Sequence, residues 1–224
     1  MKQGLYLPEF ERDNCGAGFI CNLKGEKSNA IIHDALEILI KLEHRGAVSS
    51  DGKTGDGAGI LIDIPHTFFI KNTSFNLPEP KEYAVGMVFL PQNDNQRDFC
   101  KNAFEAEIKN QKLEILGWRK VPVDSSQLGP IALASEPAIE QIFIAKPEGT
   151  SDENFKAKLY PARKITEHLI ADSKMSESSY FYLPSLSTTT LIYKGIIMPE
   201  DIGPYYTDLQ QPDLVTRLAF ILSL

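Results

Sequence analysis

The chain has 224 residues, which suits one large domain or two small ones, and its 42% hydrophobic and 24% charged residues are ordinary for a globular protein. A formal net charge of -7 argues against nucleic acid as a partner, because an acidic chain gains nothing from neutralising phosphates. No stretch approaches 18 uninterrupted apolar residues, so no membrane-spanning segment is predicted.

The chain starts with MKQGLYLPEFERDN, which contains no apolar run of signal-peptide length and carries three acidic side chains. We therefore expect no secretory signal and a cytoplasmic location. The three cysteines, Cys15, Cys21 and Cys100, are an odd number, which argues against a disulfide framework. A strand from Cys15 to Cys21 would span roughly 20 Å, too far for a disulfide. Cys21 and Cys100 are expected to be small buried hydrophobes.

A short buried strand is predicted over residues 17–23. The clearest helix is predicted over 30–43, where apolar residues recur at i, i+3, i+4 and i+7 from Ile32. Ser28 or Asn29 can cap its first turn.

Further along the chain, the order of elements favours layered α+β architecture over a strict βαβ alternation. Pro161 is expected to kink or divide the helix that contains it. Residues 178–188 and 189–199 predict a hairpin, and the apolar residues 214–224 are expected to lack neighbouring strands and to leave an open sheet edge. The remaining predicted elements are strands over 60–65, 83–91, 113–123 and 139–146 and helices over 95–110 and 152–173.

Residues 44–59, HRGAVSSDGKTGDGAG, form a glycine-rich loop between a helix and a strand. Its spacing is G-x-G-x-G, without the Gly-Lys-Ser/Thr of a P-loop, and its order is the reverse of a dinucleotide-binding turn. Lys53 and Gly55 occupy positions where a calcium loop needs oxygen ligands, and the four histidines show no paired metal spacing, so no metal site is predicted. Taken alone, the loop indicates a tight connection with several residues at positive φ.

Two segments together carry a resemblance to a known family: GLYLPEFERDNCGAGFI at 4–20 and LEHRGAVSSDGKTGDGAGILIDIPHTFF at 42–69. Both closely resemble the start of glutamate synthase large chains, and the similarity continues at 158–164, 181–195 and 198–209. The resemblance implies a propeptide-like leader at 1–14 and a class II glutamine amidotransferase domain at 15–224. It further implies the αββα sandwich of N-terminal nucleophile hydrolases, incomplete here at the C-terminus.

The same resemblance implies that Cys15 is the catalytic nucleophile. Hydrolysing the side-chain amide of glutamine needs a nucleophile, a proton acceptor and an oxyanion site. In this family the nucleophile is the first residue of the mature chain, and its own α-amino group takes the thiol proton. Cleavage between Asn14 and Cys15 is therefore expected. Attack would form a γ-glutamyl thioester and release ammonia, and water would then free glutamate.

Gly16, Arg45 and Asp56 are expected to support the substrate pocket. Arg45 either orients the nucleophile region or bonds the carbonyls of the glycine-rich loop, and both readings stay open. Gly16 and residues 54–59, which include Asp56, are expected to shape the pocket floor, and no ligand contact is assigned to them.

The family's Arg for the glutamine carboxylate, its Asn-Gly oxyanion pair and its Asp for the substrate amine find no match in these 224 residues. We expect FMN, an iron–sulfur cluster, the synthase domains and a small reductase subunit to belong to missing parts of the parent enzyme, and no cofactor to bind this chain. Three functions remain: a glutaminase fragment of an enzyme that makes glutamate from glutamine and 2-oxoglutarate, a non-catalytic remnant, or another class II amidotransferase. The electron donor could be NADPH, NADH or ferredoxin.

Overall fold

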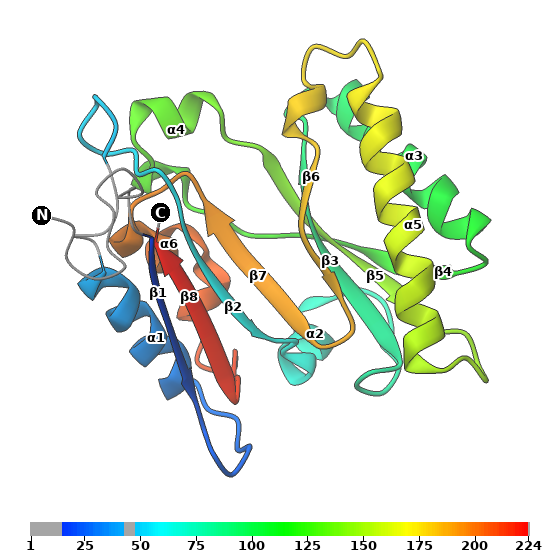
Figure 1. Cartoon of the computed structure of the whole chain (residues 1–224), viewed down its shortest axis with the longest axis horizontal. Coiled ribbons are helices and arrows are strands. Elements are labelled where there is room, and N and C mark those ends of the chain that lie inside the picture. The colour runs from blue at the N-terminus through cyan, green and yellow to red at the C-terminus, as the bar shows by residue number, and fades with distance from the viewer. Residues whose placement is uncertain (1–14, 43–47, 224) are drawn as a thin grey trace, which may run out of the picture.

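The computed structural model describes residues 15–42 and 48–223, so the leader at 1–14 and Arg45 lie outside the described residues. Within them, eight strands form two four-stranded antiparallel sheets, which confirms the α+β prediction (Figure 1). The first sheet has the order β1 (Gly16–Cys21), β8 (Leu218–Ser223), β2 (Ala58–Asp63), β7 (Thr190–Gly195). The second has the order β4 (Glu114–Lys120), β5 (Ala138–Ala145), β3 (Tyr83–Leu90), β6 (Tyr182–Ser187).

Helices cover one face of each sheet. α1 packs on β1 and β8, whereas α3 and α5 lie side by side against the second sheet (Figure 1). None of the helices in the described part of the chain is long and apolar enough to cross a membrane. The helices are α1 (Ala30–Lys41), α2 (His66–Asn72), α3 (Asp94–Asn110), α4 (Pro130–Ala134), α5 (Asp152–Ala171) and α6 (Ile202–Tyr205), with 3₁₀ turns at Ser125–Gln127, Ser178–Tyr180, Pro199–Asp201 and Thr207–Gln210.

Residues of both sheets and of α1 and α2 form one hydrophobic core, and a second core lies between the second sheet and its helices. β3 contributes to both, because its side chains alternate between faces: Val85 and Met87 enter the shared core, and Ala84 and Val88 enter the other. A strand buried on both faces needs a nearly continuous apolar sequence, as in YAVGMVFL.

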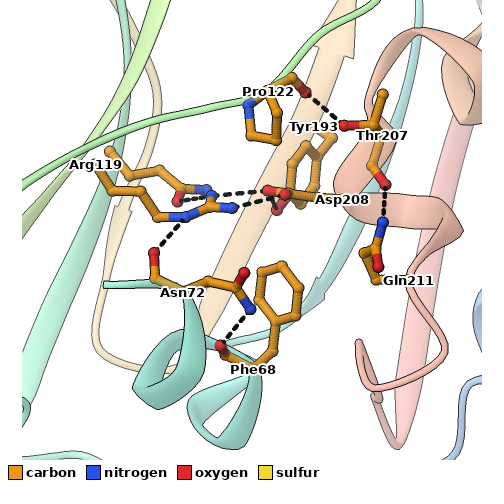
Figure 2. Close-up of polar contacts among 9 residues, drawn as sticks. Phe68, Asn72, Arg119, Pro122, Tyr193, Thr207, Asp208 and Gln211 are labelled. Atoms are coloured by element: carbon orange, nitrogen blue, oxygen red, sulfur yellow. Dashed lines mark hydrogen bonds and ion pairs between the residues drawn. The ribbon is translucent and has the colours of Figure 1, made fainter. Parts of the chain in front are cut away.

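A buried ion pair fastens the second sheet to the segment after β7 (Figure 2). The Arg119 guanidinium of β4 donates two hydrogen bonds, of 2.8 and 2.7 Å, to the Asp208 carboxylate. The Tyr193 hydroxyl donates to the same carboxylate at 3.1 Å. The two charged side chains are only 9% and 2% exposed, so the pair is part of the core.

Two strand predictions were wrong because partners distant in sequence decide pairing. β6 and β7 do not form a hairpin: β6 pairs with β3 in the second sheet, and β7 pairs with β2 in the first. Residues 214–224 do not leave an open edge either. β8 inserts between β1 and β2 and is hydrogen-bonded on both sides.

Burial was also mispredicted for the first strand. β1 is the edge strand of its sheet, and Cys21 and Phe19, the latter 71% exposed, lie on the face that α1 does not cover. Cys100 is buried as predicted.

Helix ends and breaks differ from expectation at three places. Asn29 makes no side-chain cap to α1, because its backbone is helical, with φ -73° and ψ -28°, whereas a capping residue is typically extended. Its side-chain amide donates to the carbonyls of Gln211 and Leu214. α5 runs through Pro161 as one helix, so the alternative of two separate helices is wrong. α2 follows directly on the predicted strand stop at Pro65, a helix that the sequence did not indicate.

Candidate functional site at the Cys15 end of the first sheet

Cys15 is exposed and directly precedes β1. In the sheet, Gly16 lies opposite Ser223, and Ser223 lies opposite Ala58 on its other side. The starts of β1 and β2 are therefore two strand spacings apart, about 10 Å. The fold thus brings Cys15 to the same end of the sheet as the glycine-rich loop that leads into β2 (Figure 1).

Small residues occupy this end of the sheet. The register places Gly16, Ser223, Ala58 and Gly195 in one row across all four strands. Because side chains alternate along a strand, Ala17, Phe19 and Cys21 lie on the face opposite Gly18. A Cβ built on Gly18 would lie 3.2 Å from Ile38 of α1, so these three residues are on the face that α1 does not cover, and Cys15 directly precedes this strand.

On that uncovered face lies a cleft of about 830 Å³ between the two sheets and α4. Asp56, Gly57 and Gly59 line the end near Cys15, although Cys15 itself is not part of the lining. The walls are mainly apolar and include Leu61, Phe89, Tyr182, Phe220 and Leu222.

The charged side chains among the described residues of this lining are Asp56, Glu136 and Lys194. Glu136 accepts hydrogen bonds from the hydroxyls of Ser125, at 2.8 Å, and Tyr205, at 2.9 Å. Lys194 donates to the Tyr182 hydroxyl at 3.1 Å. Lys194 lies three strands and two residues from Cys15, so the two backbones are about 16 Å apart.

Tyr205 is a hydrogen-bond donor in this wall, not a base. Burial raises the pKa of its hydroxyl far above the ordinary value, and the neighbouring Tyr206 and the hydrogen bond to Glu136 raise it further. Sequence reasoning missed Glu136, Lys194 and Tyr205, since nothing in the local sequence links them to Cys15.

The predicted support residues are only partly placed together. Gly16 is buried at the start of β1, and Asp56 is exposed just before β2, so both lie at the Cys15 end of the sheet. Arg45 lies outside the described residues. The expectation of positive φ in the loop is confirmed at Gly52, with φ 68°, and Gly57, with φ 146°.

Metal ligands and histidine bases do not gather here. The described residues contain no group of three or more His, Cys, Asp or Glu side chains that could hold a metal ion. His66 lies beyond the far end of β2, where its Nδ1 is 3.0 Å from the Tyr83 hydroxyl.

Comparison with known proteins finds that a family model described as class II glutamine amidotransferases matches residues 15–223. The glutamate synthase (NADPH) large chain of Bacillus subtilis is 41% identical over 223 residues, which cover 99% of this chain and 14% of that protein. Glutamate synthase (NADH) of Saccharomyces cerevisiae is 40% identical over 235 residues, covering 99% and 11%. Ferredoxin-dependent glutamate synthase 2 of Synechocystis is 39% identical over 213 residues, covering 93% and 13%. The chain therefore spans only a small part of the length of these relatives.

Proposed function

Because this chain belongs to the class II glutamine amidotransferases, we propose that it is the N-terminal part of the glutaminase domain of a glutamate synthase, with Cys15 as the nucleophile. One observation carries this proposal. The Cys15 thiol is exposed at the start of β1, at the end of the sheet where the glycine-rich loop borders a cleft. A nucleophile for a small amide needs such an accessible position beside a concave site.

The chemistry uses two groups of one residue. Once the leader is cleaved after Asn14, Cys15 has a free α-amino group with an ordinary pKa of about 7.7–8.0, which can accept the thiol proton. The sulfur attacks the amide carbon of glutamine, the C–N bond breaks, and ammonia leaves with that proton. Water then attacks the γ-glutamyl thioester, which releases glutamate and restores the thiol.

The proposal includes the αββα sandwich of N-terminal nucleophile hydrolases. Two antiparallel sheets with residues in one core, and α3 and α5 packed on the other face of the second sheet, support this architecture.

In the parent enzyme, the ammonia reacts with 2-oxoglutarate to form a second glutamate. FMN, an iron–sulfur cluster, synthase domains and a small reductase subunit stay predictions for regions outside this chain. The names of the relatives specify NADPH, NADH and ferredoxin at 41%, 40% and 39% identity, so similarity does not choose the electron donor.

The test uses a chimera in which Ser223 is joined to the corresponding downstream segment of the Bacillus relative, up to the end of its amidotransferase domain. Cys15→Ala is expected to abolish release of glutamate from glutamine. Cys21→Ala is a control, because Cys21 is also exposed and lies at the other end of β1. Cys21→Ala and Cys100→Ala are expected to retain turnover.

Mass spectrometry after incubation with an electrophilic glutamine analogue gives an independent readout, with the adduct expected on Cys15. Full activity in Cys15→Ala, or equal labelling of Cys21, would refute the assignment. A correctly folded chimera with no turnover at all would favour a non-catalytic remnant.

A further inference from the structure

We infer that Asp51 and Thr54 are positioning residues that set the width of the cleft mouth beside Cys15, by fastening the glycine-rich loop to α4. The inference rests on the proposed function, since it concerns the cleft through which glutamine would reach the thiol. Neither residue touches the thiol's end of the sheet directly, and both act through the loop that they hold.

Residues 48–55 form a tight hairpin. Val48 bridges Gly55, and the Ser49 amide donates to the Thr54 carbonyl at 2.7 Å. Within the turn, the Asp51 carboxylate accepts the amides of Lys53 at 3.0 Å and Thr54 at 2.8 Å. These local bonds shape the hairpin but would occur in any Asx turn, so they do not themselves fix its place in the fold.

What fixes the hairpin is a set of bonds to α4, some 80 residues later in the chain. Asp51 accepts the Ile131 amide at 3.1 Å, and the Thr54 hydroxyl accepts the Ala132 amide at 3.2 Å. The Thr54 hydroxyl donates in turn to Asp51 at 2.6 Å. The N-cap position of α4 is Gly129, which has no side chain, so the hairpin supplies the capping acceptors that this short helix lacks.

Close packing leaves the hairpin little freedom. A Cβ built on Gly129 would lie 2.6 Å from the Thr54 hydroxyl, and one on Gly55 would lie 2.9 Å from the Ile197 carbonyl oxygen. Thr54 is 1% exposed. The hairpin is thus held between α4 and the segment that follows β7, and glycine is needed on both contact surfaces.

The two fastened elements form the mouth of the cleft. Asp56 and Gly57, which continue the hairpin into β2, line the cleft on the Cys15 side. Ala132 of α4, with Ser135 and Glu136 just beyond it, also lines the cleft. Because Asp51 and Thr54 join these walls, the distance between the walls depends on their hydrogen bonds.

The fastening is charge-assisted. The hydrogen bond from the Thr54 hydroxyl, with those from the backbone amides of Lys53, Thr54 and Ile131, holds the pKa of Asp51 well below its ordinary value. The carboxylate is therefore ionised at neutral pH, and hydrogen bonds to an ionised acceptor are stronger than neutral ones.

Hydrogen exchange on the 224-residue chain tests the inference without requiring activity. In Asp51→Ala and Thr54→Val, the amides of Ile131 and Ala132 are expected to exchange about tenfold faster, the factor that losing one or two hydrogen bonds produces. Thr54→Ser keeps the hydroxyl and is expected to restore wild-type exchange at both amides.

The matched control is Asp124→Ala. The Asp124 carboxylate accepts the amide and hydroxyl of Ser126 in its own turn. Within the described part of the chain, the Asp124 carboxylate bonds Ser126 and Gln127 and not α4, so exchange at Ile131 and Ala132 should stay as in the wild type. Cys15→Ala is also expected to leave it unchanged, so a failure of the proposed chemistry would not disturb this readout.

Acceleration confined to the hairpin and α4, and reversed in Thr54→Ser, would support the positioning role. Unchanged exchange at Ile131 and Ala132 in Asp51→Ala would overturn it. Faster exchange spread evenly over the core strands β3 and β5 would also overturn it. That result would show that Asp51 and Thr54 stabilise the whole fold and do not act locally between the hairpin and α4.

Discussion

Replacing Asp208 by Ala is expected to be among the most damaging single changes to stability. The carboxylate receives both terminal nitrogens of Arg119 and the Tyr193 hydroxyl (Figure 2). Without it, the guanidinium would keep only the Gln141 side-chain oxygen at 2.9 Å and the Asn72 carbonyl at 3.1 Å as acceptors. A charge that is 9% exposed would then be buried without a counter-ion.

The expected cost is about 3–5 kcal/mol, the range for removing one partner of a buried ion pair. The total stability of a domain is about 5–15 kcal/mol, so the loss would take about a fifth or more of it. Asp208→Leu combined with Arg119→Met is expected to recover much of this loss, because an apolar pair leaves no charge to solvate.

The assay is urea-induced unfolding followed by circular dichroism, with Asp213→Ala as the control. Asp213 also pairs with a cation, Lys71, at 3.1 Å, but the two side chains are 36% and 65% exposed. An exposed pair contributes about 0–1 kcal/mol, so the control should unfold nearly like the wild type. Equal, small losses in Asp208→Ala and Asp213→Ala would refute the reasoning that burial of the first pair sets its cost.

Three further predictions concern the site and the packing. The isolated 224-residue chain is expected to be essentially inactive on glutamine, because the expected Asn-Gly oxyanion pair finds no match in this sequence. Losing one oxyanion donor typically raises the activation free energy by about 3–4 kcal/mol. Cys15-dependent glutamate release near that of an intact domain would contradict this prediction. The leader is expected to stay attached in this chain, so N-terminal sequencing should find Met1 or the residue after it, and finding Cys15 first would show a more complete site. Gly117→Ala is expected to destabilise the fold by about 1–3 kcal/mol, since the new methyl would lie 2.4 Å from the Phe75 ring. An unchanged midpoint of urea-induced unfolding would show that the ring moves aside freely.

The candidate site could be predicted from sequence only where its residues are close to recognisable motifs. Cys15, Gly16 and Asp56 were found in this way, and the fold places all three at one end of the first sheet. The other charged residues of the cleft lining could not be found, because Glu136 follows α4 and Lys194 lies on β7, both far from Cys15 in the sequence. No local pattern marks such residues.

By itself, the sequence determined the elements whose signal is local. Apolar periodicity gave α1, α3 and the doubly buried β3, because burial of one face or of both imposes a repeat on neighbouring residues. Glycine content likewise indicated a loop with positive φ, which Gly52 and Gly57 confirm.

Only the tertiary structure decided which strands pair and which faces are covered. β8 lies between β1 and β2, almost 160 residues from the nearer of them in sequence, and β6 and β7 join different sheets although they are adjacent in the chain. Cys21 is exposed because, among residues 15–42 and 48–223, β1 is the edge strand of its sheet and no helix covers that face. The hydrogen bond from the Ile131 amide of α4 to Asp51 likewise joins residues that lie 80 positions apart in the chain. The physical reason is that a strand or a carboxylate needs a partner of complementary geometry, and a sequence window contains no information on which distant segment supplies it.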